Sequence, residues 1–376
     1  MRRLSRRAWL ASQAPAAPAA GPALEQTDVW VSRADGYHTY RIPAIVRTPA
    51  GTLLAFCEGR KTSARDHGDI DLLLKRSTDG GRSWSSQQVV YEEGGTAEVT
   101  IGNPCPVVDS DTGAVWLPFC RDNRRVLVTH STDDGIRWSW PVEITPHVKR
   151  PEWGWVATGP GVGIQLAMGP RRGRLLIPCD HQTLSEGRPV KRSHVFYSDD
   201  HGQSWRLGGW VADHTDECQV VETADGRLLI NMRNYWERDG GRPERGGMRA
   251  IAHSSDGGES WTGLSFDEAL VEPVCQASLL RYTLASTRGR NRLLFSNPAS
   301  RDKRVRLTVR LSYDEGASWP AARVIHEGPA AYSCLVVLAD QTIGCLYERG
   351  QEHPYQKISF ARFNLEWLSG GADRPA

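Results

Sequence analysis

The sequence predicts an all-β fold, a six-bladed β-propeller built from four-stranded antiparallel blades. Three observations favour this fold: an eight-residue motif that occurs five times, an apolar hairpin pattern that occurs six times, and a composition rich in turn residues. The 376 residues include 37 Gly and 22 Pro, and 39% are hydrophobic, which is typical of a soluble, turn-rich β protein. Successive copies of the motif start 54, 67, 56 and 58 residues apart, and such a period indicates a repeat architecture.

The repeated motif has the frame Ser-x-Asp-x-Gly-x-(Ser/Arg)-Trp. Its Asp side chain can cap nearby backbone amides and its Gly accepts a positive φ, so the motif favours a turn. An apolar or alternating run precedes each copy. We therefore interpret the motif as the turn of a β-hairpin whose Trp folds back on the sheet, an architectural role. The copies occupy residues 77–84, 131–138, 198–205, 254–261 and 312–319.

The second repeat is an apolar strand, a turn marked by Gly or Asp, and another apolar strand. Combined with the motif hairpins, it predicts six four-stranded units, which are the blades of a propeller. A strand over 27–31 is expected beside 357–363, where it closes the ring and covers the sheet edges. We expect one propeller domain over 27–370, an N-terminal tail over 1–26 and a C-terminal tail over 371–376. The six strand pairs are 42–46 with 51–56, 104–108 with 115–118, 163–166 with 175–178, 219–221 with 228–230, 277–280 with 293–295, and 333–337 with 343–347.

Charge and cysteine usage exclude several classes of protein. A net charge of +2 gives no basic footprint for nucleic acid, and no apolar run approaches the roughly 18 residues that span a bilayer. The eight Cys form no CxxC pair and no zinc-like spacing, so we expect buried free thiols. We therefore expect no metal, no cofactor, no nucleic-acid partner and no membrane span, and we expect a monomer.

The N-terminal stretch leaves the cellular location open. Residues Ser5 to Leu10 resemble a twin-arginine export signal, but the following residues, Ala11 to Pro15, are too polar and proline-rich for its apolar region. A cytoplasmic protein with an N-terminal tail and an exported protein both remain compatible with the sequence.

Propeller geometry restricts where functional residues can lie. The inner strand leads each blade, so the starts of first strands and the loops between second and third strands open on one face. The Ser-x-Asp-x-Gly motifs open on the opposite face. Ionisable residues from four units fall on the first face, namely Arg41, Asp66, Glu217, Arg233, Arg304, Tyr332 and Glu348.

Three of these residues are arginines, which points to an anionic ligand. A guanidinium group binds a carboxylate with two parallel hydrogen bonds, and three around one point form an anion site that a neutral sugar does not need. The expected ligand therefore carries its own carboxylate. The other nearby arginines are interpreted as solvated or motif-flanking charges, namely Arg227, Arg301, Arg306 and Arg310.

The acidic run around Asp66 allows an alternative. Asp66, Asp69 and Asp71 have a spacing that could suggest a calcium loop. The alternation that continues into Leu72 instead places Asp69 and Asp71 on one face of a strand. Asp66 is then the loop residue available for chemistry.

On these residues the chain resembles the exo-α-sialidases, a retaining glycoside hydrolase family. The repeated motif resembles the Asp box, or bacterial neuraminidase repeat, which also occurs in several non-enzymatic β-propellers. The resemblance covers residues 36 to 363 and includes the Arg-Ile-Pro motif of that family. The matching stretches are Tyr40 to Pro43, Asn103 to Pro106, Thr158 to Gly161, Glu217 to Val220, Glu272 to Gln276, Tyr332 to Leu335, and Leu346 to Glu348.

The resemblance implies a role for each of the seven residues. Arg41, Arg233 and Arg304 resemble the arginine triad that binds the sialic acid carboxylate, and Glu348 is expected to hold Arg41.

Tyr332 resembles the nucleophile, Glu217 its base, and Asp66 the acid/base that serves the leaving oxygen. A Tyr nucleophile suits this substrate because the anomeric carbon bears a carboxylate that would repel a second carboxylate.

Three further residues are implied as substrate-binding groups. Asn103 and Gln276 are expected near the glycerol or N-acetyl side of the sugar. His181, with Asp180, is expected in the loop after the second strand of the third unit. Trp153 and Trp155 are interpreted as either a cover for the aglycone or packing residues.

The resemblance implies a metal-independent exo-α-sialidase that removes terminal α-linked sialic acid, with retention, from glycoproteins, glycolipids or oligosaccharides. Two alternatives remain open at this point: a trans-sialidase, which shares all seven residues, and a non-catalytic propeller that binds sialylated glycans. A binding module needs the arginines but not Tyr332, Glu217 and Asp66. The preferred linkage and form of sialic acid are not determined by the sequence.

Overall fold

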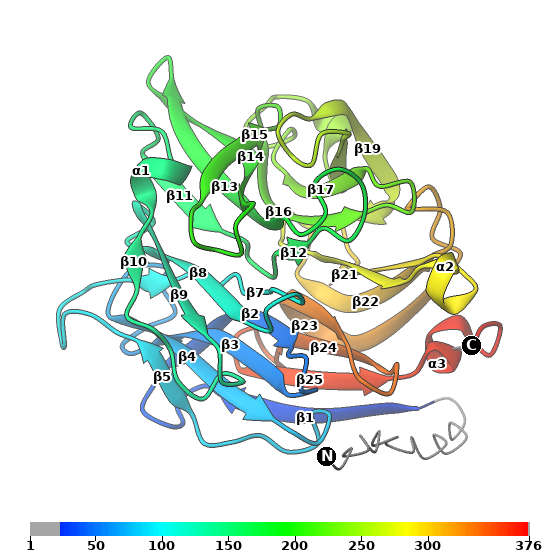
Figure 1. Ribbon diagram of the computed structural model, residues 1–376, viewed down its shortest axis with the longest axis horizontal. Coiled ribbons are helices and arrows are strands. Elements are labelled where there is room, and N and C mark those ends of the chain that lie inside the picture. Colours follow the sequence, from blue (N-terminus) through cyan, green and yellow to red (C-terminus); the bar gives the residue numbers. More distant parts are fainter. Residues whose placement is uncertain (1–22, 375–376) are drawn as a thin grey trace, which may run out of the picture.

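The computed structural model describes residues 23–374, and the twin-arginine-like stretch lies outside them. Figure 1 shows the sheets arranged around a common centre, where the inner strands β2, β7, β12, β16 and β23 lie. The described part of the chain is nearly all strand, with three short α-helices and one 3-10 helix. The chain therefore forms an all-β propeller whose strands are antiparallel within each sheet.

Two sheets have four strands in sequence order. The first consists of β2 (Thr39–Arg47), β3 (Leu53–Arg60), β4 (Ile70–Ser77) and β5 (Gln88–Tyr91). The other consists of β16 (Thr215–Glu222), β17 (Leu228–Asn234), β18 (Met248–Ser254) and β19 (Thr262–Val271).

In two other sheets the inner strand is divided into two pieces. One contains β6 (Ile101–Gly102), β7 (Val107–Val108), β8 (Val115–Arg121), β9 (Arg125–Ser131) and β10 (Val142–Glu143). The next contains β11 (Trp155–Thr158), β12 (Ile164–Gln165), β13 (Leu175–Ser185), β14 (Arg188–Ser198) and β15 (Arg206–Trp210). Proline lies in each gap, at Pro104, Pro106 and Pro160, and proline cannot donate a ladder hydrogen bond. The single inner strands expected for these two units are therefore interrupted.

The last sheet has seven strands because one long strand belongs to two groups. Its order is β1-β25-β24-β23-β22-β21-β20. The first half of β23 pairs with β22, and its second half, from Ala330 onward, pairs with β24. The strands are β20 (Ser278–Thr283), β21 (Arg292–Pro298), β22 (Val305–Ser312), β23 (Ala321–Val337), β24 (Ile343–Arg349), β25 (Lys357–Phe363) and β1 (Leu24–Val31).

The N-terminal strand closes the ring beside the C-terminal one. Strand β1 pairs with β25 along its whole length, and Figure 1 shows the two running side by side. The strand begins at Leu24, three residues before the expected Thr27. The expected C-terminal tail also contains an anchored residue, Asp373, whose carboxylate accepts from Arg292 Nε at 2.7 Å.

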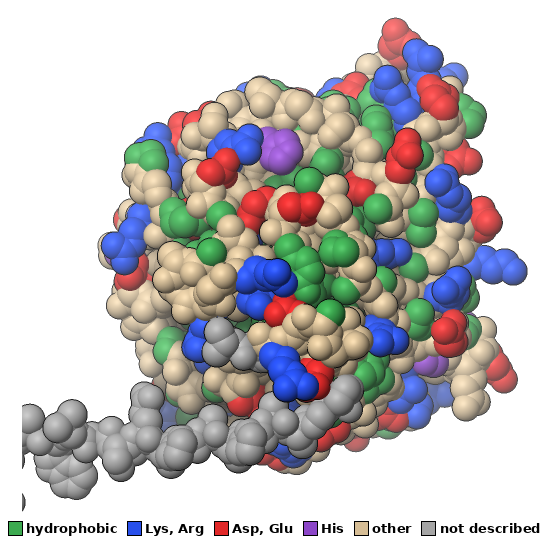
Figure 2. Space-filling model, turned by 90° about the vertical axis from the view of Figure 1, so that its right-hand side faces the viewer, with side chains coloured by type: hydrophobic (Ala, Val, Ile, Leu, Met, Phe, Trp, Pro, Cys, Tyr) green, Lys and Arg blue, Asp and Glu red, His purple; other side chains and the backbone are tan. Residues whose placement is uncertain are grey.

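The remaining elements are short helices in connecting segments. They are α1 (Thr145–Val148), η1 (Pro243–Arg245), α2 (Ala285–Arg288) and α3 (Leu365–Ser369). No helix within residues 23–374 is long and apolar enough to cross a membrane. Figure 2 shows acidic and basic side chains interspersed over the face that it presents, without a large area of one sign among the described residues there.

All eight cysteines are buried free thiols, as the sequence predicts. Burial raises the pKa of the Cys57 thiol well above its usual value, and the charge of Glu58 adds to this effect. These thiols are therefore neutral packing groups.

The five Ser-x-Asp-x-Gly motifs occupy the turns between third and fourth strands, as predicted. In the first, Ser77 Oγ donates to Asp79 Oδ1 at 2.8 Å, and the same Asp oxygen accepts from Ser83 N at 3.0 Å. Equivalent bonds from Ser to Asp occur in the other four copies. The motif Trp rings pack on the sheets, as Trp84 does edge-on against Phe360.

The motif glycine lies against the preceding sheet. Gly81 has φ +85°, and a Cβ there would lie 2.1 Å from Phe360 Cε1 on β25. The corresponding Gly202 faces Trp116 of the previous sheet equally closely, at 2.1 Å. The motifs therefore join neighbouring sheets, and they leave the opposite end of the ring available for the site.

We predict that Gly81→Ala destabilises the protein more than Gly51→Ala. Gly51 has a similar φ of +93° but open space around its Cβ position, so its replacement costs only backbone strain of about 1 kcal/mol. The clash with Phe360 should add about 1–3 kcal/mol. Urea unfolding of both variants measures the difference, and equal stabilities would show that the motif does not join the sheets in this way.

Candidate active site

A cavity of about 260 Å³ lies on the end of the ring opposite the motifs. Its walls come from the starts of inner strands and from the loops that follow second strands. Seven of the ten predicted site residues line it: Arg41, Asp66, Asn103, Glu217, Arg233, Arg304 and Tyr332. Residues that are far apart in the sequence are therefore brought to one place.

Three of the lining residues lie at irregularities of their inner strands. The strand register shifts between Arg41 and Ala44 in β2, between Thr215 and Cys218 in β16, and between Ala330 and Ser333 in β23. Such bulges bend a strand and redirect its side chains. They allow Arg41, Glu217 and Tyr332 to face the cavity.

The bulge in β2 includes backbone strain. Ile42 follows Arg41 and has φ +61°, a left-handed conformation that a β-branched residue adopts only when its surroundings impose it. Its N–H donates to Glu348 Oε1 at 2.9 Å. That buried carboxylate compensates for the strained turn.

Glu348 supports the site from below the cavity. It is fully buried, and it accepts from Arg41 Nε at 2.7 Å and from Arg41 Nη2 at 3.3 Å. Its second oxygen also accepts from Tyr332 N at 3.1 Å. One carboxylate thus fixes an arginine on β2 and a tyrosine on β23. Burial opposes the charge on Arg41, but the attraction of Glu348 raises the Arg41 pKa well above its usual value.

Tyr332 lies in a three-residue hydrogen-bond network. Its hydroxyl donates to Glu217 Oε1 at 2.5 Å and accepts from Arg233 Nη1 at 3.1 Å. The same Arg233 nitrogen donates to Glu217 Oε2 at 2.7 Å. Burial, followed by the charge of Glu217, raises the Tyr332 pKa well above its usual value. The resting hydroxyl is therefore neutral, with a carboxylate placed to accept its proton.

Arg304 approaches Tyr332 from another side. Its guanidinium carbon lies 5.6 Å from the centroid of the Tyr332 ring, and its Nη1 donates to Tyr355 Oη at 2.8 Å. Tyr355 also lies under Arg41, whose guanidinium carbon is 3.9 Å from its ring centroid. This tyrosine was not predicted from the sequence. It lies in a loop without a recognisable motif, and no sequence pattern points to it.

Asp66 is held by two arginines although its side chain is 70% exposed. Arg60 Nη1 donates to its Oδ1 at 2.8 Å, and Arg41 Nη1 lies 3.6 Å from the same oxygen. Burial raises the pKa of Asp66, but the charges of Arg60 and Arg41 outweigh this effect and hold the pKa below its usual value.

Arg60 is itself held by Glu58, and neither was predicted from the sequence. Glu58 Oε2 accepts from Arg60 Nε at 3.0 Å and from Nη2 at 2.7 Å. Both residues end the second strand of the first sheet, the kind of position that the propeller register favours for function. This placement is the signal that could have found them.

Two buried acids line the cavity beside Glu217. Burial raises the pKa of Asp180 well above its usual range, and the negative charges of Asp216 and Glu217 add to this effect. Burial also raises the pKa of Asp216 to about 6, against the opposing charge of Arg233. Asp180 Oδ2 accepts from Trp155 Nε1 at 3.2 Å, whereas its buried Oδ1 has no partner.

Asn103 faces the cavity as predicted. Its Oδ1 accepts from Asn123 Nδ2 at 2.9 Å, and its N–H donates to Glu58 Oε1 at 3.0 Å. Trp155 lines the cavity too, whereas Trp153 does not.

The predicted substrate-binding roles of Gln276 and His181 are not met by their positions. Gln276 is buried, and its amide is used by bonds to Pro160 O at 3.2 Å and to Ser333 O at 3.0 Å. It supports the strand that carries Tyr332. His181 stacks on Trp153 with ring centroids 3.6 Å apart. Because alternate residues of β13 face opposite sides, Asp180 faces the cavity and His181 faces away from it.

One group of side chains within residues 23–374 has metal-ligand spacing. Asp109, Asp111 and His201 lie together in turns at the motif end of the ring, where Gln165 Nε2 donates to Asp109 Oδ1 at 2.8 Å. This group belongs to a different end of the molecule from the cavity.

Comparisons with known proteins agree with this geometry. Residues 51–346 match the family described as a BNR repeat-like domain. A curated exo-alpha-sialidase of Aspergillus fumigatus is 33% identical over 382 residues, which cover 89% of this chain and 86% of that protein. The chain belongs to the BNR-repeat sialidase family.

Two further members of this family are similar to the chain. A sialidase of Micromonospora viridifaciens is 37% identical over 382 residues, which cover 95% of this chain but 56% of that protein. The chain thus spans little more than half of that relative. Among solved structures, the Hadza microbial sialidase Hz136 has a TM-score of 0.78 and 30% identity, covering 89% of this chain and 67% of that one.

We predict that Asp216→Asn stabilises the protein at neutral pH but not at pH 4. Because the folded pKa is raised to about 6, the unfolded chain loses this proton first as pH rises above about 4. The wild type therefore loses stability between about pH 4 and 6, and the loss persists above that range. Asparagine avoids this loss and keeps the acceptor for Glu217 N.

Thermal unfolding from pH 4 to 7.5 measures this effect, with the exposed Asp302→Asn as control. The melting temperature of Asp216→Asn should exceed that of the wild type at pH 7, by about 2–4 °C for each kcal/mol. A constant difference across the pH range would contradict the raised pKa.

Proposed function

We propose that this chain is an exo-α-sialidase that hydrolyses terminal α-linked sialic acid with retention of configuration. The observation that carries this proposal is the Tyr332 hydroxyl between Glu217 at 2.5 Å and Arg233 at 3.1 Å. A binding protein needs no proton acceptor aimed at a buried tyrosine. A nucleophile with its base in hydrogen-bond reach is the arrangement that covalent catalysis requires.

The three arginines are proposed to bind the carboxylate of the sugar. Arg41, Arg233 and Arg304 converge around Tyr332 from three sheets. The Nε atom of Arg233 is buried without a partner, so a donor is available at this point. Charge-assisted bonds to a carboxylate are about twice as strong as neutral hydrogen bonds, and they would place the anomeric carbon above Tyr332.

In the first step, Tyr332 Oη would attack the anomeric carbon while Glu217 takes its proton. The bond between that carbon and the glycosidic oxygen breaks, and Asp66 gives the leaving oxygen a proton. The products of this step are the released alcohol and a sugar joined to Tyr332. A tyrosine suits this role because it is neutral until it attacks, whereas a carboxylate would be repelled by the substrate's own carboxylate.

In the second step, Asp66 would take a proton from water, and the resulting oxygen attacks the anomeric carbon. The bond to Tyr332 breaks, and Glu217 returns the proton to the tyrosine. Two displacements at one carbon give net retention. The low pKa of Asp66 suits the role of base; for its role as acid, a bound substrate carboxylate would offset the charge of Arg41 and raise that pKa.

We propose six blades for this fold. Strand β23 pairs with β22 through its first half and with β24 through its second half, so the seven-stranded sheet divides there. Its first part would contain β20, β21, β22 and the start of β23. Its second would contain the end of β23 with β24, β25 and β1.

We predict that the wild type releases the fluorophore of a 4-methylumbelliferyl α-sialoside, with EDTA present throughout. Tyr332→Phe should lose about 100-fold or more in kcat yet still bind a sialic acid analogue, because it lacks the nucleophile but keeps the arginines. Arg304→Ala should lose about 10-fold or more in binding, since a hydrogen bond to a charged group contributes about 1.5–3 kcal/mol.

Calorimetric titration with the analogue measures binding for both variants, and unfolding curves confirm that they are folded. Equal and full binding by both would show that the roles are misassigned. Wild type that binds the analogue but releases no fluorophore would identify a non-catalytic propeller.

A further inference from the structure

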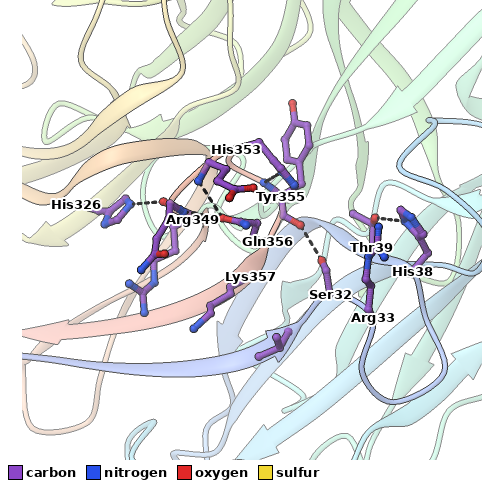
Figure 3. A pocket seen from close by; sticks show the side chains of 14 residues that line it. Ser32, Arg33, His38, Thr39, His326, Arg349, His353, Tyr355, Gln356 and Lys357 are labelled. Atoms are coloured by element: carbon purple, nitrogen blue, oxygen red, sulfur yellow. Dashed lines mark hydrogen bonds between the residues drawn. The ribbon is translucent and has the colours of Figure 1, made fainter.

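A second and larger cavity, of about 620 Å³, lies beside the candidate active site. It is bounded by the end of β1, the loop that leads into β2, the first half of β23, and the loop between β24 and β25. Figure 3 shows His326 and Arg349 on one side of it and Arg33 and His38 on the other. The cavity has room for a sugar unit, and its walls come from the same end of the ring as the active site.

Positively charged and imidazole groups dominate the lining. Arg33, Arg349 and Lys357 are full cations, and Glu352 is the single carboxylate among the residues that line it. Three histidines complete the set, namely His38, His326 and His353. A cavity with this composition favours an anionic ligand.

Part of this charge is already balanced. Asp28, which lies outside the lining, accepts from Arg349 Nη2 at 2.8 Å and from Lys357 Nζ at 2.6 Å. The guanidinium of Arg33 has no hydrogen bond or ion pair to any side chain or backbone group within residues 23–374. Arg33 is thus the cation that remains available to a ligand.

The cavity shares a wall with the candidate active site. Tyr355 lines both cavities. Its carbonyl accepts from Ser32 Oγ at 2.7 Å on the side of the larger cavity, while its hydroxyl accepts from Arg304 at 2.8 Å on the other. One residue therefore separates the two spaces.

The larger cavity lies on the side from which a leaving group would depart. The N–H of His38 donates to Arg60 O at 2.9 Å, and Arg60 holds Asp66, the proposed acid for the glycosidic oxygen. A sugar attached through that oxygen would start next to Asp66. The loop that carries Arg33 and His38 is the next wall it meets.

We infer that the larger cavity binds the carboxylate of a second acidic sugar, with Arg33 as its main contact. The favoured source is the substrate itself, a glycan whose penultimate unit also carries a carboxylate, such as a disialyl chain. This inference rests on the proposed function of the neighbouring site, and it names a substrate class for that site. A free acidic sugar has the same chemistry and is the other source.

The test compares binding to the inactive Tyr332→Phe protein, so that it does not depend on turnover. The probes are a disialyl oligosaccharide, a monosialyl oligosaccharide and free N-acetylneuraminic acid, titrated calorimetrically. Arg33→Ala should weaken binding of the disialyl probe by about 5–10-fold, a loss of about 1–1.4 kcal/mol. Binding of the monosialyl probe should change by less than about twofold.

The control is Arg137→Ala, which removes an exposed arginine from a motif turn at the opposite end of the ring. It should leave all three affinities unchanged. Free N-acetylneuraminic acid that binds at a second site in Tyr332→Phe, and loses that site in Arg33→Ala, would identify the free sugar as the source. A disialyl affinity unaffected by Arg33→Ala, together with one site for the free sugar, would overturn the inference.

A parallel assay on the active protein separates this inference from the proposed function. Hydrolysis of both oligosaccharides, with kcat/KM for the disialyl one reduced about 5–10-fold by Arg33→Ala, would support both. Hydrolysis with equal effects on the two substrates would overturn the inference alone. Absence of hydrolysis by the wild type would contradict the proposed function, and the calorimetric comparison would still decide the inference.

Discussion

The buried carboxylate of Glu348 is the interaction on which the site depends. It is fully buried, and it binds the guanidinium of Arg41, the strained N–H of Ile42 and the N–H of Tyr332. A buried charge of this kind is costly unless each of its acceptor positions is used. Here those positions are used by groups from the two strands whose neighbouring sheets meet where the ring closes. Closure of the ring and assembly of the site are therefore one event.

The site balances an excess of buried charge by mutual pairing. Arg233 is paired with Glu217 and Arg60 with Glu58, while Asp66 lies between two arginines. Such pairs contribute little net stability because desolvation offsets their attraction. What they provide is position, since each head group is fixed by at least two bonds before any ligand arrives. Preorganised charge is the main way in which a rigid site stabilises a transition state.

The sequence predicted the repeated elements well because their signals are local. The Ser-x-Asp-x-Gly turns follow from residues close in sequence, and the register of strands then placed Arg41, Glu217 and Tyr332 at one end of the ring. The bulges that aim these residues depend on the packing of several sheets, and no local pattern encodes them.

The predictions that failed depended on the face of a strand or on a loop. His181 shares a strand with Asp180, and a shift of one residue reverses the side it faces. Gln276 has the right chemistry for a ligand, but its bonds to neighbouring backbone appear only in three dimensions. Tyr355 lies in a loop between β24 and β25, and its contact with Arg41 joins residues that are far apart in the chain.

The central claim is that Tyr332 acts as a nucleophile activated by Glu217. The most direct measurement is proton NMR of the sugar anomer that is released first from an α-sialoside by the wild type, recorded before mutarotation. The account predicts that the α-anomer appears first and converts slowly to the β-anomer, because two displacements at the anomeric carbon retain its configuration. Release of the β-anomer first would mean that water attacks directly, and it would contradict a covalent role for Tyr332.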